Sequence, residues 1–271
     1  MDKLKKLRKV LKDMDSVLVA YSGGLDSSFL LKIAVDVLGN NVLAVTAKSP
    51  TYPQEELKSA VKTASSIGSR HLIIKTKEFS DKKFIVNSTQ RCYFCKKELF
   101  AVLKQIAKDK GFRFVVEGST LSDRNDFRPG NKAKKEFKIR SPLVEAGFVK
   151  ADVRRISKVL GLNTWDKPPL ACLASRIPYD TRISLSLLKQ IENGESALRK
   201  LGFRQVRLRV YNGLCRIEVG KEEIPQIILK HQAIVSKLKR SGYKYITVDL
   251  EGYRTGSMNP VTARSNRKNS G

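Results

Sequence analysis

The first half of the chain alternates short apolar runs with longer amphipathic stretches. The apolar runs are rich in β-branched residues and have the length of buried strands, and they cover residues 15–21, 42–47, 71–75 and 112–117. Apolar positions at helical spacing predict helices over 27–38, 55–67, 99–110 and 150–160. Strands that alternate with helices predict an α/β fold with a doubly wound parallel sheet. Ligands of such a sheet bind beyond the carboxyl ends of its strands, where the turn after Tyr21 is expected.

The pattern changes at about residue 185. A helix is predicted over 186–201, and two strands over 205–210 and 214–219 join at Asn212-Gly213, a strong signal for a hairpin turn. A helix over 222–241 and a strand over 245–250 complete a small βαβ-like or ferredoxin-like module. We therefore predict a first domain at 1–180, a smaller α/β domain for substrate or oligomer contacts at 181–261, and a disordered tail at 262–271.

Charge and composition narrow the partners only slightly. The 271 residues have a formal net charge of +27, which attracts polyanions such as RNA, nucleotides and phosphorylated metabolites. The lysines are spread along the whole chain, so a lysine-rich surface set by the source organism explains the charge as well as an anionic partner does. No apolar run has the length of a membrane span, and the basic residues 1–10 are not followed by an apolar signal core. We therefore predict a cytoplasmic protein.

The strongest local signal for chemistry is the string YSGGLDSS at residues 21–28, between the first strand and the helix that follows it. Gly23 and Gly24 let the backbone approach an anion and expose its N–H groups, and Ser22, Ser27 and Ser28 add hydroxyl donors. The helix N-terminus favours phosphate through its unpaired amides and its dipole. Asp26 repels phosphate, so we expect it to hold Mg²⁺ against the phosphates. A plain turn with a serine cap would explain two glycines, but not the whole string.

The cysteines are the second signal. Cys92 and Cys95 form a Cys-x-x-Cys pair, which suggests metal or redox chemistry. Cys172 follows Pro168-Pro169, which predicts a loop, and the cations Lys167 and Arg176 around it favour its thiolate. The fourth cysteine, Cys215, has apolar neighbours in the predicted hairpin and is expected in the core.

The loop at 21–28 resembles the PP-loop of the ATP-pyrophosphatase superfamily, whose members split ATP between its α- and β-phosphates. This implies ATP and Mg²⁺ as cofactors and adenylation of a carboxylate or carbonyl oxygen. Over nearly its whole length the chain resembles the LarE family, the ATP-dependent sulfur transferases that build the nickel-pincer nucleotide cofactor of lactate racemase. The motifs that carry this resemblance are SGGLDSS, 91–96, 117–119, 126–130, 140–143, the loop around Cys172, 201–203, 207–209, 216–219 and 252–259.

The LarE resemblance implies a pyridinium mononucleotide substrate with two carboxylates, each adenylated and then converted to a thiocarboxylate. In one branch of the family, the cysteine at the Cys172 position gives up its own sulfur. In the other branch, three cysteines hold a 4Fe–4S cluster whose open iron carries a transferable sulfide. Cys92, Cys95 and Cys172 match the second branch, and Cys172 and Asp26 are the expected catalytic residues. A zinc site completed by Cys215 or a histidine, and a persulfide relay, are the alternatives.

Further site residues follow from the resemblance. The ATP site is expected to include, besides the loop, the strand-end residues Ala20, Thr46, Lys48 and Gly118. The substrate or its phosphate is expected to contact Arg176, Glu195, Arg207, Arg209, Glu218 and Arg254, because arginine donates paired hydrogen bonds to phosphate. The alternative for each of these charges is a solvated strand face. Ser119-Thr120 departs from the Thr-Asn of the family pattern, so we assign no role there.

The expected partners are the nucleotide substrate, sulfide or another sulfur donor, and further copies of the chain in a homo-oligomer. The rival enzyme is a tRNA thiolase, since such proteins also combine a PP-loop with Cys-x-x-Cys and a third cysteine, and the positive charge suits RNA. Nucleic acid is the less favoured partner, because the chain has no zinc-ribbon pairs and no recognisable RNA-binding module. A nucleotide-binding or iron–sulfur scaffold without catalysis is the third hypothesis.

Overall fold

The computed structural model describes residues 2–125, 129–169 and 171–258. The chain divides into two compact units, one formed by Met1–Leu173 with Tyr179–Leu188 and the other by Ala174–Pro178 with Lys189–Gly271. The motif residues 126–128 and Asn259, and the predicted tail at 262–271, lie outside the described residues.

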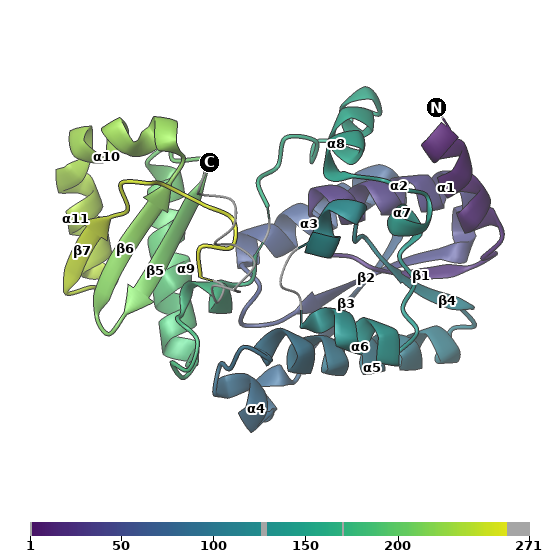
Figure 1. Ribbon diagram of the computed structural model, residues 1–271, viewed down its shortest axis with the longest axis horizontal. Helices are drawn as coiled ribbons and strands as arrows, with labels where there is room; N and C mark the ends of the chain where they lie inside the picture. The colour runs from purple at the N-terminus through teal and green to yellow at the C-terminus, as the bar shows by residue number, and fades with distance from the viewer. Residues whose placement is uncertain (1, 126–128, 170, 259–271) are drawn as a thin grey trace, which may run out of the picture. The chain divides into compact units, whose positions relative to one another are not determined.

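The first unit contains a four-stranded parallel sheet in the order β3-β2-β1-β4 (Figure 1). Its strands are β1 (Val17–Ala20), β2 (Val42–Lys48), β3 (Arg70–Lys75) and β4 (Phe114–Glu117). The central strand β1 and the first four residues of β2 are apolar and mostly buried, because helices cover both faces of the sheet. The order reverses between β1 and β4, and this switch point is where doubly wound sheets bind ligands. The doubly wound parallel sheet predicted from the sequence is therefore confirmed.

Helices cover both faces of this sheet (Figure 1). One face carries α1 (Asp2–Lys12), α2 (Leu25–Leu38), α3 (Gln54–Ile67), α7 (Pro142–Glu145) and α8 (Lys150–Val159). The other carries α5 (Arg91–Asp109) and α6 (Gly130–Glu136), and α4 (Lys82–Ile85) precedes α5. Successive β1 side chains point to opposite faces, so Val17 and Val19 join one core and Leu18 joins the other. Short 3₁₀ turns lie at Gly39–Asn41, Glu78–Ser80, Leu121–Asn125 and Leu173–Arg176.

Helix α5 begins eight residues before the helix predicted at 99–110. The sequence RCYFCKKE at its start has no apolar stripe, so the hydrophobic pattern did not reveal this part of the helix. Arg91 is buried there and donates to Asn87 Oδ1, which satisfies a charged side chain in a position that helices usually fill with apolar groups. The earlier start places Cys92 and Cys95 on the first turns of a long helix.

The second unit has a three-stranded sheet in the order β5-β6-β7. The strands β5 (Val206–Tyr211) and β6 (Leu214–Val219) form the predicted antiparallel hairpin, and β7 (Tyr245–Val248) runs parallel to β6. Asn212 and Gly213 both have positive φ, at 45° and 88°, as a tight hairpin turn requires.

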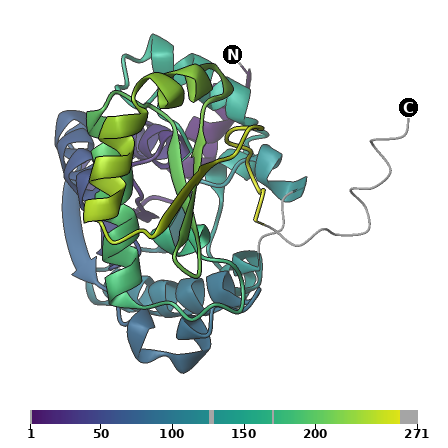
Figure 2. The same ribbon diagram turned by 90° about the vertical axis from the view of Figure 1, so that its left-hand side faces the viewer.

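Helices pack on one face of this smaller sheet (Figure 2). They are α9 (Leu185–Lys200), α10 (Ile224–Leu229) and α11 (His231–Arg240), and a 3₁₀ turn at Lys221–Glu223 precedes α10. The single helix predicted at 222–241 is thus wrong, since the chain breaks at Lys230, whose ammonium donates to the Leu201 carbonyl at 2.6 Å. The Leu208 side chain packs against α9, since a Cβ added to Gly194 of that helix would lie only 2.5 Å from Leu208 Cδ1. Because side chains alternate along a strand, Arg207 and Arg209 point to the opposite face of the sheet.

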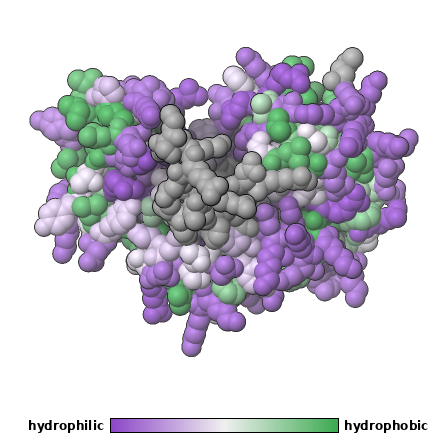
Figure 3. All heavy atoms as spheres, in the orientation of Figure 1, coloured by the Kyte–Doolittle hydropathy of each residue, from purple (hydrophilic) through white to green (hydrophobic). Residues whose placement is uncertain are grey.

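Hydrophilic residues dominate the visible surface of both units, and the hydrophobic ones form small separate groups (Figure 3). Within the described part of the chain, no helix combines the length and apolar character needed to cross a bilayer.

Candidate functional site

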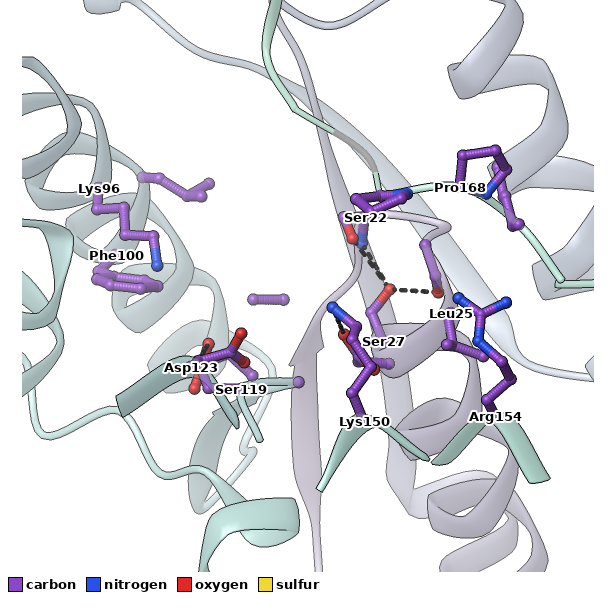
Figure 4. A pocket seen from close by; sticks show the side chains of 18 residues that line it. Ser22, Leu25, Ser27, Lys96, Phe100, Ser119, Asp123, Lys150, Arg154 and Pro168 are labelled. Carbon is purple, nitrogen blue, oxygen red and sulfur yellow. Dashed lines mark hydrogen bonds and ion pairs between the residues drawn. The ribbon is translucent and has the colours of Figure 1, made fainter. Parts of the chain in front are cut away.

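A pocket lies at the switch point of the parallel sheet, beyond the carboxyl ends of β1 and β4 (Figure 4). Its volume of about 330 Å³ falls in the range of small-molecule sites. The turn between β1 and α2 lines it with Ser22, Gly24, Asp26 and Ser27, and the end of β4, which packs against this turn, lines it with Gly118. Ala20 also lines the pocket, so several residues predicted for ATP surround one cavity.

Two glycines set the shape of the turn. Gly23 has φ +64°, and a Cβ there would lie 2.5 Å from the Cβ of Ala60 on α3. A Cβ on Gly118 would lie 2.9 Å from the backbone nitrogen of Ser27. Any side chain at either position would push the turn away from α3 or β4, so the glycines hold its backbone amides at the head of α2.

Hydroxyl groups hold the turn between β1 and α2 in place through hydrogen bonds. The Ser27 hydroxyl donates to the Gly24 carbonyl at 3.2 Å and lies 3.0 Å from the Ser22 hydroxyl. The buried Thr46 donates to the Tyr21 carbonyl at 2.8 Å, and Ser28 lies 3.3 Å from the Tyr21 hydroxyl. Thr46, Ser28 and the exposed Lys48 are not among the residues that line the pocket. Thr46 and Ser28 therefore support the turn from inside the protein.

Four cationic side chains surround the pocket: Lys96, Lys150, Arg154 and Lys167. The Lys150 ammonium lies 3.1 Å from the Asp26 carboxylate, and Figure 4 shows Lys150 and Arg154 on the same side of the cavity. Sequence reasoning assigned no ATP role to these cations, because they come from distant segments. The only signal was the i, i+4 spacing of Lys150 and Arg154, which places both on one face of α8.

A buried carboxylate organises the wall beside β4. Glu117 accepts hydrogen bonds from the hydroxyls of Ser119, at 2.6 Å, and Ser141, and its ion pair with Lys134 measures 3.3 Å. Burial alone would raise the pKa of Glu117, but Lys96, Lys134 and the two hydroxyls outweigh it and hold the pKa below its usual value. The carboxylate therefore stays ionised and fixes positive charge next to the pocket.

The structure brings the three predicted cluster cysteines within electrostatic reach of one another. Burial and then the thiolate charge of Cys172 raise the pKa values of both Cys92 and Cys95. Cys92 and Cys95 are three residues apart on α5 and so face the same side of the helix, while Cys172 comes from the loop after α8. Cys215 is fully buried in the second unit, as predicted, and burial raises its pKa to about 12.

Arg91 is a cation that lies beside Cys92. Its guanidinium lies 3.9 Å from Cys92 Sγ, and although burial lowers its pKa, the charges of Cys172 and Cys92 outweigh burial and raise it. Lys167 pairs with Glu56 at 2.6 Å and Arg176 with Glu195 at 2.8 Å, and the effect of these two cations on the Cys172 thiolate stays a prediction.

Among the side chains that the structure describes, no three His, Cys, Asp or Glu residues converge to hold a single metal ion. A 4Fe–4S cluster makes a different demand, because each cysteine ligates a different iron and the sulfurs stand apart around the cluster. Cys92 and Cys95 on α5 and Cys172 on a second segment are the three residues that could supply thiolates to such a cluster.

A second polar cluster lies in the second unit. Glu195 is fully buried, accepts from both arms of Arg176 at 2.8 and 2.9 Å, and has its pKa lowered because Arg176 outweighs the effect of burial. Arg209 pairs with the fully buried Glu218 at 2.8 Å. These residues are buried, so they are not the solvated strand-face charges of the alternative.

Arg207 and Arg254 differ from these pairs. Arg207 is 7% exposed, its guanidinium lies over the Tyr253 ring, and burial followed by the charge of Arg176 lowers its pKa to about 10. Arg254 is half exposed and pairs with Glu251 at 2.7 Å.

A parallel sheet with a glycine–serine loop at the head of its first buried helix defines a PP-loop nucleotide-binding domain. Residues 16–134 match the model of the arginosuccinate synthase N-terminal HUP domain, which spans this loop. The pyridinium-3,5-bisthiocarboxylic acid mononucleotide synthase of Lactiplantibacillus plantarum is 38% identical over 94% of this chain and 93% of its own length. The chain belongs to the LarE family and is an ATP-dependent sulfur transferase.

Two uncharacterized proteins show the same full-length similarity. One, from a Synechocystis strain, is 42% identical over 97% of this chain and 98% of its own length. The other, from Methanocaldococcus jannaschii, is 33% identical over 93% of this chain and 98% of its own length. The similarity thus extends across both units, not only the PP-loop domain.

Proposed function

We propose that this enzyme adenylates the carboxylates of a pyridinium mononucleotide and replaces an oxygen of each with sulfur. The observation that carries the proposal is that both cysteine-bearing segments also line the nucleotide pocket. On α5, Cys92 and Cys95 are followed within two turns by the pocket residues Lys96, Leu99 and Phe100. On the other segment, Lys167 to Pro169 line the pocket and Cys172 follows. This supports a reaction in which the cysteines supply sulfur to an adenylate formed in the pocket.

In the first step, a substrate carboxylate oxygen attacks the α-phosphorus of ATP, and pyrophosphate leaves. The amides at the head of α2 and the pocket cations Lys96, Lys150 and Arg154 suit the charge that develops on the departing phosphates. Asp26 would hold Mg²⁺, and Lys150, which neutralises Asp26 in this structure, would then be available to a phosphate oxygen. Mg²⁺ would supply charge neutralisation between the phosphates.

In the second step, a hydrosulfide sulfur attacks the acyl carbon, AMP leaves with the bonding electrons, and the thiocarboxylate forms with loss of a proton. Adenylation is needed because a carboxylate oxygen is a poor leaving group, whereas AMP is a good one. We propose that the buried arginines Arg207 and Arg209 of the second unit bind the phosphate of the substrate, since arginine pairs well with phosphate.

We further propose that Cys92, Cys95 and Cys172 ligate a 4Fe–4S cluster. Such a cluster supplies an open iron that carries sulfide, which makes sulfur transfer repeatable. The support is the donor set of three interacting thiols. The alternatives are sacrifice of the Cys172 sulfur and a persulfide relay.

The test of the reaction is an anaerobic assay with Mg-ATP, the pyridinium dicarboxylate mononucleotide and sulfide. We expect pyrophosphate release that depends on the mononucleotide, and thiocarboxylate products detected by mass spectrometry. Tight ATP binding without pyrophosphate release would contradict the proposal and favour a non-catalytic scaffold. Pyrophosphate release that depends on tRNA, and weakens steeply with salt, would favour the thiolase instead.

The test of the cluster is iron and labile-sulfide analysis of anaerobically purified wild type, Cys172→Ala and the control Cys215→Ala. We expect about four irons per chain and a broad visible absorbance band in wild type and in the control, and loss of both in Cys172→Ala. Absence of iron in wild type, with Cys172 losing the mass of H₂S during turnover, would contradict the cluster and establish the sacrificial route.

A further inference from the structure

The Lys167 side chain is mostly buried, and its ammonium contacts three polar groups of the first unit. Its ammonium lies 2.6 Å from Glu56 Oε2, 3.2 Å from the Gly23 carbonyl and 3.2 Å from the Ser59 hydroxyl. The side chain is only 16% exposed. Gly23 belongs to the turn between β1 and α2 at residues 21–24, which we call the phosphate turn. Glu56 and Ser59 lie on the first turns of α3, the helix that packs against this turn.

The segment that begins at Lys167 is attached again at its other end. The Leu173 amide donates to the Thr51 carbonyl at 2.8 Å. Thr51 is in turn held by Ser49, which donates to the buried carboxylate Glu78. Lys167 before Cys172 therefore contacts the phosphate turn and α3, and Leu173 after Cys172 is bonded to the loop that precedes α3.

We propose that Lys167 is a positioning residue that fixes the Cys172 segment against the phosphate turn, so that Cys172 keeps its place relative to the adenylate. This inference rests on the proposed function, because it takes Cys172 as a sulfur-handling residue. Lys167 is suited to the task because one ammonium donates three hydrogen bonds, and its partners here are a carboxylate, a carbonyl and a hydroxyl. Pro168 and Pro169 follow Lys167 directly, and each proline ring fixes a backbone φ angle on the way to Cys172.

The alternative role for Lys167 is direct binding of an ATP phosphate, since it lines the pocket. The two roles predict different losses. A phosphate ligand contributes to adenylation, whereas a positioning residue for Cys172 contributes only to the transfer of sulfur that follows.

The test compares Lys167→Met with wild type in the anaerobic assay, measuring pyrophosphate release and thiocarboxylate formation separately. We expect pyrophosphate release close to that of wild type and thiocarboxylate formation lower by up to about a hundredfold, the cost of a small misplacement of a reacting group. Lys167→Arg should recover part of the product, because it retains the ion pair with Glu56. The control is Lys62→Met, which removes an exposed lysine from α3.

A second measurement does not depend on the reaction. Trp165 is the only tryptophan and lies two residues before Lys167, so its fluorescence reports on this segment. We expect stronger quenching by acrylamide in Lys167→Met than in wild type or Lys62→Met, with an unchanged circular dichroism spectrum.

Each outcome decides a separate point. Equal loss of pyrophosphate and product in Lys167→Met would overturn the positioning role in favour of phosphate binding, and no loss of either would overturn it outright. Unchanged Trp165 quenching would also count against it. A wild type that releases no pyrophosphate would instead contradict the proposed function itself.

Discussion

At the scale of single residues, the site depends on what certain side chains lack. Gly23 is needed twice over, for its positive φ and because Ala60 occupies the space of a Cβ. The sequence identified this glycine from the string in which it stands. It did not reveal Ala60, which lies on α3, the helix that follows the next strand.

We therefore predict that Gly23→Ala disables the phosphate turn. The left-handed backbone costs about 1 kcal/mol or more in a non-glycine residue, and the collision with Ala60 adds to it. Pyrophosphate release should fall steeply, and the thermal unfolding midpoint should drop. The matched control is Gly39→Ala at the other end of α2, which has φ +53° but no atom within 4 Å of the new Cβ. Similar activity losses in both variants would show that backbone strain alone, and not the collision, matters.

At the scale of elements, the β5–β6 hairpin buries an arginine–glutamate ion pair on one face of its sheet. Arg209 and Glu218 are on adjacent strands, two positions out of register, with side chains 6% and 0% exposed. The sequence placed them on strands but left open whether they face solvent. Burial was decided by packing on the face of the sheet opposite to α9, which a strand pattern of alternating apolar and polar residues hides.

We predict that Glu218→Leu destabilises the protein by about 3–5 kcal/mol, because it leaves Arg209 buried without its carboxylate. The double variant Arg209→Met/Glu218→Leu should lose much less, because no charge is then left uncompensated. The control Arg254→Met breaks an exposed ion pair and should change stability by about 1 kcal/mol or less. Urea unfolding measures all three. Equal losses in the single and double variants would contradict the ion-pair explanation.

The start of α5 is the second lesson at this scale. The helical pattern became visible only at residue 99, whereas the helix begins at Arg91. The early turns carry a buried arginine and two cysteines instead of an apolar stripe, so the departure from the usual pattern coincides with the residues that we propose as cluster ligands.

At the scale of the whole molecule, acid should weaken both units. Glu117 in the first unit and Glu195 in the second have pKa values held below normal by neighbouring cations. A carboxyl group with a lowered folded-state pKa stabilises the protein above its unfolded pKa, about 4.3, and this contribution is lost as the pH falls toward the folded-state value. Acid also removes negative charge from a chain whose net charge is already +27.

We predict that the free energy of unfolding declines as the pH falls from about 6 to about 3, and that Glu195→Gln, although less stable at neutral pH, declines less steeply. Urea unfolding at each pH measures this. A pH dependence that is the same in wild type and Glu195→Gln would show that other carboxyl groups are responsible.

The sequence by itself determined the α/β class, the strands of both sheets, the hairpin at Asn212-Gly213 and the phosphate turn, because these depend on hydrophobic period and local backbone chemistry. It also pointed to the LarE family, which full-length similarity confirms. Only the tertiary structure decided which distant cations surround the pocket, that Arg91 lies beside Cys92, and that the arginine–glutamate pairs are buried. Those facts depend on contacts between segments far apart in the chain, and no local pattern encodes such contacts.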